Sequence, residues 1–293
     1  MIQKIVITFL ILTIGYNCIG QKADSLCNCQ KTVPIGTIAF GTMSFIALNE
    51  MWYKDYPRSS FHFFNDGDEW LQMDKAGHAF SAYQLNQFFF NQYQRTGYDV
   101  KRSLRNATIS ALSYMTTIEM LDGFSKNWGF SPWDFSANLS GSLLHLIQQK
   151  KWGEQKIQMK FSYHETPFSK YNPSQLGDNF QQRVFKDYNG QTYWLSFNST
   201  LLFNNNNTFR DVLSLSIGYS ASEMTHAKTN NFIVNNFQRH REFLFSFDAD
   251  LNRVKWKRKG LKKVMRVFNV IKVPLPTMKI RENGKISFHL FYF

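Results

Sequence analysis

Hydrophobic residues recur at helical spacing through the first half of the chain. This pattern predicts an apolar helix at 33–53 and further helices at about 75–93, 101–121 and 131–149. The last helix opens with Ser131 and Pro132, a typical N-cap followed by a proline in the first turn. The uncharged part of 33–53, about 15 residues, favours a buried helix over a membrane span. Four helices with short connections predict a bundle.

After Gly153 the apolar residues recur at every second position. Five segments alternate in this way, at 157–163, 193–198, 213–219, 243–251 and 286–292. Such alternation predicts an antiparallel sheet with one apolar face, and the polar run 204–207 is typical of a hairpin loop. Two interpretations remain open. One is a soluble β domain, and the other is an outer-membrane barrel, which needs at least eight strands.

The predicted fold class is therefore α+β. A helical domain of about four helices occupies 21–153, and an antiparallel β-rich domain with one basic amphipathic helix occupies 154–293.

The first 20 residues are typical of a secretory signal peptide. Lys4 precedes an apolar stretch at 5–14, and Gly20 provides a small residue for cleavage. Cys18 follows Tyr16-Asn17 rather than the small residues of a lipobox, which favours cleavage after Gly20 over lipidation. The remaining Cys27 and Cys29 have a spacing unsuited to a mutual disulfide. We expect an exported protein that is periplasmic or associated with the outer membrane.

Positive charge is concentrated near the C-terminus. The chain has 34 basic and 21 acidic residues, and 12 of the basic residues but only one acid lie in 253–285. Apolar residues at helical spacing within this stretch predict a basic amphipathic helix that ends before Pro274, with Lys272 on its basic side. The candidate membrane-surface residues are Trp256, Lys262, Lys263, Arg266 and Phe268.

Two interpretations of the basic helix remain open. It either lies on an anionic membrane surface or covers the sheet and turns a solvated basic face outward. Nucleic acid is not an expected partner, because an exported protein seldom meets it and the sequence has no stacking-and-basic motif.

A second set of candidate residues lies on the predicted helices. It consists of Asp74, His78, Glu119, Asp122, Asp134 and Asn138. Asp74 and His78 are four residues apart and share a helical face. Glu119 is an acid in a last helical turn, where it needs a partner. Structural interpretations also apply, since Asp74 and Asp134 suit helix caps, and His145 is expected on the surface near a helix C-terminus.

Carboxylates with one histidine suit either a divalent metal or acid–base chemistry, with His78 as the base. No H-E-x-x-H motif is present, and the sequence does not specify a metal. Two functions are therefore considered. One is a non-enzymatic envelope protein whose β domain docks to membrane or to a partner protein. The other is a metal-assisted hydrolase or transferase that acts on envelope lipid or cell-wall precursors.

Three motifs carry a resemblance to a known family. They are D-K-x-G-H at 74–78, E-x-x-D-G-F at 119–124 and D-x-x-A-N-x-x-G at 134–141. Together they resemble the YfiM-type family of predicted periplasmic lipoproteins, a family of unknown function. Their spacing is also similar to that of VanZ-like proteins. The resemblance covers about residues 70–145 and implies an envelope location without an assigned activity.

Overall fold

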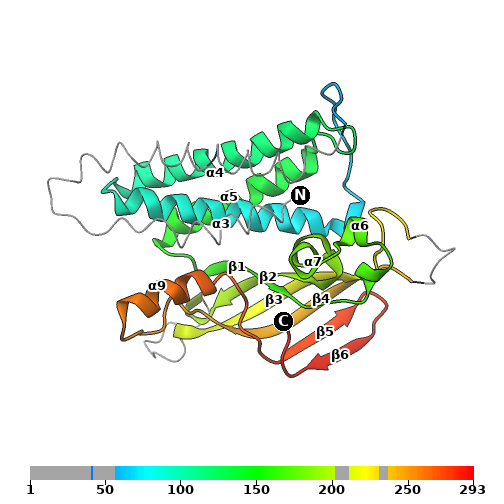
Figure 1. The fold of residues 1–293 in the computed structure, drawn as a ribbon. Helices are drawn as coiled ribbons and strands as arrows, with labels where there is room; N and C mark the ends of the chain where they lie inside the picture. The colour runs from blue at the N-terminus through cyan, green and yellow to red at the C-terminus, as the bar shows by residue number, and fades with distance from the viewer. Residues whose placement is uncertain (1–40, 42–56, 202–210, 231–236) are drawn as a thin grey trace. The chain divides into compact units, whose positions relative to one another are not determined.

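The computed structural model describes residue 41 and residues 57–201, 211–230 and 237–293 (Figure 1). Outside these ranges lie the predicted signal peptide, the three cysteines, the predicted hairpin loop at 204–207 and all of the segment 33–53 except residue 41. The chain divides into two compact units. The first consists of the chain up to Gly67 together with His78–Gly153, and the second of Asp68–Gly77 together with Glu154–Phe293. Helices followed by an antiparallel sheet confirm the α+β class.

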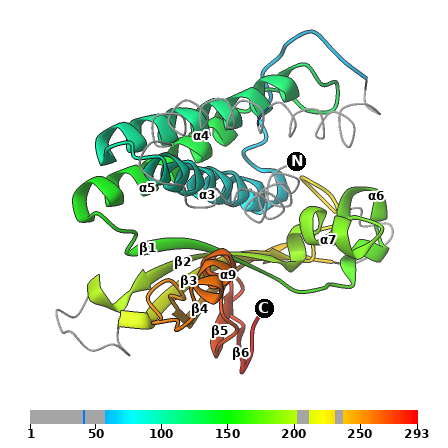
Figure 2. The same cartoon turned by 60° about the vertical axis from the view of Figure 1, so that its left-hand side comes forward.

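The described part of the first unit contains three long helices, and the first of them begins within the second unit. They are α3 (Met73–Arg95), α4 (Val100–Gly123) and α5 (Pro132–Trp152), and they lie alongside one another in both views (Figures 1 and 2). The Asp99 side chain accepts a hydrogen bond from the backbone N–H of Arg102 and so caps α4. Ser131 caps α5 by accepting from the backbone N–H of Asp134 at 3.1 Å. The three helices confirm the predicted ranges to within a few residues.

The first unit buries apolar side chains between α3 and α4, among them Leu85, Phe89, Met115 and Ile118. Helix α5 is different, because it turns a polar stripe inward. The buried stripe consists of Asp134, Asn138, Gly141 and His145. The exposed side chains of α5 include Phe135, Leu139, Leu143 and Ile147.

The second unit contains a six-stranded antiparallel sheet in the order β1-β2-β3-β4-β5-β6. The strands are β1 (Ile157–Tyr163), β2 (Gln191–Asn198), β3 (Leu213–Ser222), β4 (His240–Ala249), β5 (Thr277–Arg281) and β6 (Ile286–His289). Five of them match the predicted segments, whereas β5 was not predicted. Helices α6 (Pro173–Leu176) and α7 (Phe180–Lys186) lie between β1 and β2, and α9 (Lys259–Phe268) lies between β4 and β5.

The sheet has its polar face inside and its apolar face more exposed. Buried positions of β1, β3 and β4 include Gln158, Lys160, Ser214, Ser216, Glu242 and Asp248. The intervening positions carry large apolar side chains that pair across strands, such as Leu215 opposite Phe247 and Ile217 opposite Phe245. These four apolar side chains are 42–50% exposed. The prediction of one apolar face is correct, but that face is not the one that the second unit buries.

The buried polar face contains an ion pair. Lys160 Nζ is 2.7 Å from Asp248 Oδ2, and both side chains are fully buried. Lys160 also donates to the Ala249 carbonyl oxygen at 2.9 Å, and Ser196 donates to Asp248 Oδ2 at 2.8 Å. These additional hydrogen bonds offset part of the cost of removing both charges from water.

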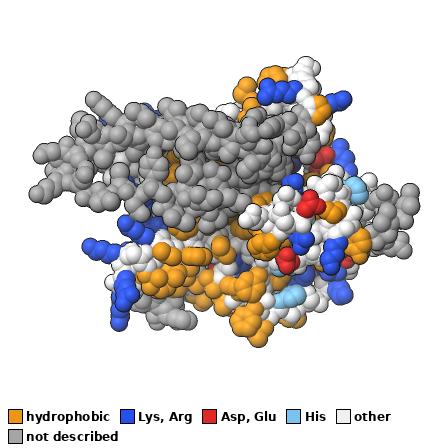
Figure 3. All heavy atoms as spheres, in the orientation of Figure 1, with side chains coloured by type: hydrophobic (Ala, Val, Ile, Leu, Met, Phe, Trp, Pro, Cys, Tyr) orange, Lys and Arg blue, Asp and Glu red, His pale blue; other side chains and the backbone are white. Residues whose placement is uncertain are grey.

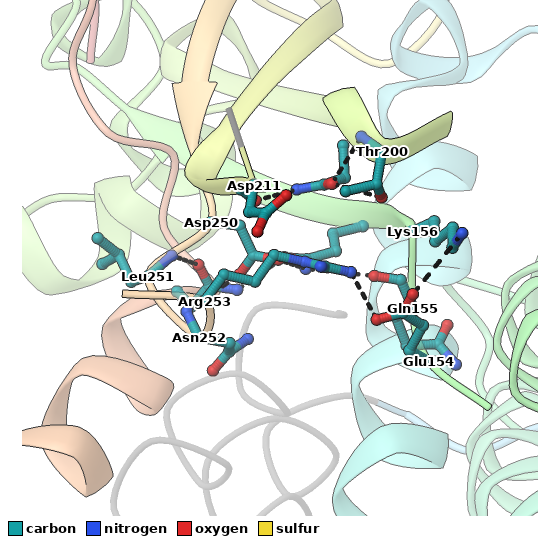
Figure 4. A network of polar contacts seen from close by, with 12 residues as sticks. Glu154, Gln155, Lys156, Thr200, Asp211, Asp250, Leu251, Asn252 and Arg253 are labelled. Atoms are coloured by element: carbon teal, nitrogen blue, oxygen red, sulfur yellow. Dashed lines mark hydrogen bonds and ion pairs between the residues drawn. The ribbon is translucent and has the colours of Figure 1, made fainter. Parts of the chain in front are cut away.

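The loop that follows β4 is held by a second polar network (Figure 4). Arg253 donates to Glu154 at 2.6 Å and its Nε lies 3.3 Å from Asp250 Oδ2. Asp250 in turn accepts from the Gln158 side chain at 2.7 Å. The chain that leads into α9 is therefore fixed to β1 and to the residues just before it.

Candidate functional site

His78, on α3, is the centre of a buried polar cluster in the first unit. Its side chain is 0% exposed. The ring Nδ1 lies 3.0 Å from Asn138 Oδ1 and 3.4 Å from Glu119 Oε1. On the opposite side of the ring, Nε2 lies 3.5 Å from Asp134 Oδ2. We call His78, Glu119, Asp134 and Asn138 the His78 cluster.

Asp134 and Asn138 are positioned by features of α5. Asp134 and Asn138 are four residues apart on α5 and therefore share a face. Ser131 fixes the start of α5 by donating to Asp66 at 2.5 Å while it accepts from the Asp134 backbone N–H. The predicted cap at Ser131 is thus present, but it uses only the backbone of Asp134. The Asp134 carboxylate instead approaches His78.

Gly141 brings α5 close to the helix that carries His78. A Cβ atom at position 141 would overlap the carbonyl oxygen of Ala79, the residue that follows His78. Only glycine therefore permits this approach of the two backbones. The glycine of the D-x-x-A-N-x-x-G motif acts through packing, next to the residues that contact the imidazole.

Two further predicted residues flank the cluster on the same helices. Asp74 lies one turn before His78 on α3, where it accepts from the Tyr188 hydroxyl at 2.9 Å and from Lys75 Nζ at 3.1 Å. Asp122 lies three residues after Glu119, buried in the last turn of α4. The structure thus brings Glu119, Asp134 and Asn138 to His78 from α4 and α5.

His145 corrects one prediction, because it is buried rather than on the surface. Helix α5 continues to Trp152, which places His145 well inside the helix, on the inward stripe. Its ring lies 5.9 Å from that of Tyr83 and 5.7 Å from that of Phe90, measured between centroids. Burial lowers the pKa of His145 to about 3, so the ring is neutral at physiological pH. The spacing of the stripe, 134, 138, 141 and 145, was the sequence signal for this position.

Helix α9 of the second unit is amphipathic, and its apolar side is exposed. Leu261, Val264 and Phe268 are 38–52% exposed. No residue of α9 is buried, and Lys262, Lys263 and Arg266 are exposed as well. Trp256 is partly buried and donates its ring N–H to the Leu251 carbonyl oxygen at 2.9 Å. We call Leu261, Val264 and Phe268 with these three basic residues the α9 surface.

Asn269, the C-cap of α9, attaches the end of the helix to the buried polar face of the sheet. Its Oδ1 accepts from Lys160 Nζ at 3.3 Å and from the Leu251 backbone N–H at 2.8 Å. Its Nδ2 donates to Gln158 Oε1 at 2.7 Å. Hydrogen bonds therefore hold the C-terminal end of α9, while none of the residues within the helix is buried.

Lys272 corrects a second prediction, since it does not belong to the basic side of the helix. The helix ends at Phe268, and Lys272 is buried with its Nζ 4.6 Å from the centre of the Trp194 ring. The Lys272 amine also donates to the Val273 carbonyl oxygen at 3.0 Å. Burial lowers the pKa of Lys272 to about 8, partly opposed by Asp248.

Hydrophobic side chains gather on the face of the second unit that carries α9, with Lys and Arg side chains at its α9 end (Figure 3). Exposed apolar residues also lie on β6 and after it, at the end of the chain. Phe288, Leu290, Phe291 and Phe293 are 58–77% exposed. No helix in the described ranges is long and apolar enough to cross a membrane.

Comparison with known proteins supports the resemblance carried by the three motifs. Residues 62–150 match a family model described as "Predicted periplasmic lipoprotein (DUF2279)". This helical part of the chain is thus similar to an envelope family without an assigned activity. No curated protein and no solved structure matches the chain. The similarity to VanZ-like proteins stays a prediction.

The family description agrees with the periplasmic location expected from residues 1–20. It also names a lipoprotein, whereas the sequence favours cleavage after Gly20. The cleavage site, lipidation at Cys18 and association with the outer membrane stay predictions.

Proposed function

We propose that this protein is a non-enzymatic envelope protein whose second unit binds an anionic membrane surface through the α9 surface. The observation that carries the proposal is the exposure of the apolar side of a strongly basic helix. A helix that served only to cover the sheet would bury Leu261, Val264 and Phe268 against it. Here these side chains are exposed.

The charge of the surrounding chain suits anionic lipid. Residues 253–285 contain 12 basic residues and one acid, Glu282. Basic side chains near an anionic leaflet contribute about 1 kcal/mol each, and apolar side chains that enter the interface add their burial. A helix with both features is typical of one that lies in the plane of the interface.

The exposed end of the chain supports the same proposal. Phe288, Phe291 and Phe293 supply apolar aromatic rings in the second unit, the unit that carries α9. Aromatic side chains suit the headgroup region, and two sites of insertion hold a protein at a surface better than one.

The alternative of a hydrolase or transferase requires a substrate to reach the His78 cluster. The His78 and Glu119 side chains are 0% and 1% exposed, and that of Asp134 is 5% exposed. This burial favours a structural role for the cluster. It therefore favours the membrane-binding function over the enzymatic alternative.

Sedimentation with vesicles tests the proposal. The purified mature chain is mixed with vesicles of phosphatidylcholine alone or with added phosphatidylglycerol. We expect binding to the anionic vesicles, and binding about tenfold or more weaker for the triple variant Leu261→Ser, Val264→Ser, Phe268→Ser.

The matched control replaces three apolar residues elsewhere that are somewhat more exposed than those of α9, Ile109→Ser, Ile147→Ser and Phe180→Ser. This control should bind as the wild type does. Equal binding by the α9 variant and the wild type, or no binding of the wild type to anionic vesicles, would refute the proposal.

A further inference from the structure

We propose that the His78 cluster is a closed binding site for a first-row divalent cation such as Zn²⁺. The cation would be held by Nε2 of His78 and Oδ2 of Asp134, with Glu119 and Asn138 as residues that position the imidazole. The site would join α3 to α5 directly and to α4 through Glu119. This inference is independent of the membrane-binding function.

The contacts of Nδ1 indicate which ring nitrogen of His78 carries the proton. Nδ1 faces two oxygen acceptors, Asn138 Oδ1 at 3.0 Å and Glu119 Oε1 at 3.4 Å. Both contacts favour the tautomer in which Nδ1 carries the hydrogen. The lone pair of a neutral His78 then belongs to Nε2.

On the other side of the ring, His78 faces the Asp134 carboxylate. Nε2 of His78 and Oδ2 of Asp134 lie 3.5 Å apart. In this tautomer both are electron-pair donors, and a cation between them makes the approach favourable. Two ligands bound to one tetrahedral zinc at about 2.0–2.1 Å lie about 3.4 Å apart, so the observed separation fits a shared ion.

The imidazole of His78 is supported on its Nδ1 side. A histidine that binds a metal usually donates its other ring N–H to a carboxylate or carbonyl oxygen, which fixes the ring and raises its basicity. Glu119 and Asn138 occupy that position at His78. Asp74 precedes His78 by one turn of α3, and the i, i+4 spacing makes it the candidate third ligand.

The donor atoms indicate the class of cation. An imidazole nitrogen together with carboxylate oxygens suits Zn²⁺, Mn²⁺ or Fe²⁺ better than Ca²⁺ or Mg²⁺, which prefer oxygen alone. The His78 side chain is 0% exposed, so an ion held there would be kept from substrates, which favours a structural over a catalytic metal site.

The experiment uses the full mature chain, stripped of metal with a chelator and titrated with Zn²⁺ by calorimetry. Thermal unfolding is followed in parallel. We expect one tight site and a Tm that rises with Zn²⁺ concentration, because a ligand of the folded state stabilises it. Asp134→Asn and His78→Gln retain side-chain size, and each should lose the tight site.

Glu119→Gln tests the positioning role, and its Zn²⁺ affinity should fall by about 10- to 100-fold. The matched control is His145→Gln, a change of another buried histidine on the inward stripe. It should retain the site. A wild-type Tm that does not respond to Zn²⁺, or Asp134→Asn and His78→Gln variants that bind Zn²⁺ as the wild type does, would overturn the proposal.

Discussion

Gly141 of α5 lies directly against the backbone of Ala79 on α3, where a single added Cβ would overlap the Ala79 carbonyl oxygen. A backbone oxygen in the middle of a helix cannot move aside as a flexible side chain can. The contact therefore fixes the distance between the two helices that carry His78 and Asp134.

Replacing Gly141 with alanine should push α3 and α5 apart. Overpacking of this kind costs about 1–3 kcal/mol, which outweighs the gain in helix propensity from alanine. Chemical denaturation measures the change. Gly260→Ala is the control, because nothing lies within 4 Å of its added Cβ, and it should be neutral or slightly stabilising. A Gly141→Ala variant as stable as the wild type would contradict the close approach.

The burial of His145 should appear in the dependence of stability on pH. The pKa of this side chain is about 3 in the folded chain, against 6.5 for a histidine in the unfolded chain. The stability is therefore fully present above pH 6.5. It falls as the pH drops toward 3, because the unfolded chain binds a proton that the folded chain does not.

Between these two pH values His145 contributes about 1.4 kcal/mol per pH unit to the slope of unfolding free energy against pH. The total slope should therefore be smaller by that amount in a His145→Phe variant, whose ring suits the neighbouring Tyr83 and Phe90. Urea unfolding at several pH values measures the slope. An identical slope in the variant and the wild type would show that His145 is accessible to protons in the folded chain.

Removing Lys160 should leave the Asp248 carboxylate buried without its ammonium partner. We expect Lys160→Met to destabilise the second unit by about 3–5 kcal/mol. The double variant Lys160→Met, Asp248→Leu should recover much of this loss, because it removes the uncompensated charge. The exposed pair of Arg102 and Asp99 is the control, and Arg102→Ala should cost less than about 1 kcal/mol.

Binding of the α9 surface to anionic vesicles should weaken as salt is added. The Debye length falls from about 10 Å at 0.1 M salt to about 3 Å at 1 M, which screens exposed lysine and arginine side chains. Replacing Lys262, Lys263 and Arg266 by glutamine should lower affinity by about 100-fold at low salt. The same replacement should also reduce the dependence of vesicle binding on salt concentration.

The matched control for this charge change is on α4. Lys101, Arg102 and Arg105 are exposed there, and their replacement by glutamine changes the net charge by the same amount. Vesicle binding by this control should follow that of the wild type. Equal losses in the two triple variants would mean that total charge, rather than the α9 surface, governs binding.

The sequence predicts the helices and most of the strands because their signals are local. Ser131 and Pro132 mark the start of α5, and the change from helical to alternating spacing after Gly153 marks the start of the sheet. Strand β5 was missed because Thr277–Arg281 closely follows two prolines in a basic segment, where the alternation is short. The end of α9 was placed too late because Asn269, rather than Pro274, is its C-cap.

The buried side of each element could not be predicted from its pattern alone. Alternation in β3 and β4 shows that the sheet has two different faces, but burial depends on what packs against each face. The same holds for α5, where the polar stripe lies inside. The contacts of His78 with Glu119 and Asp134 join residues far apart in sequence, so the motifs predicted the participants but not their pairing.

The polar buried face of the sheet also affects how the second unit responds to temperature. Exposure of apolar area on unfolding raises the heat capacity, whereas exposure of polar area lowers it. A unit that buries Lys160, Ser216 and Asp248 while leaving Phe245 and Phe247 partly exposed should therefore unfold with a small heat-capacity increment. The curve of its unfolding free energy against temperature is then broad and flat. Cooling lowers the stability of the second unit less than it lowers that of a unit with an apolar core.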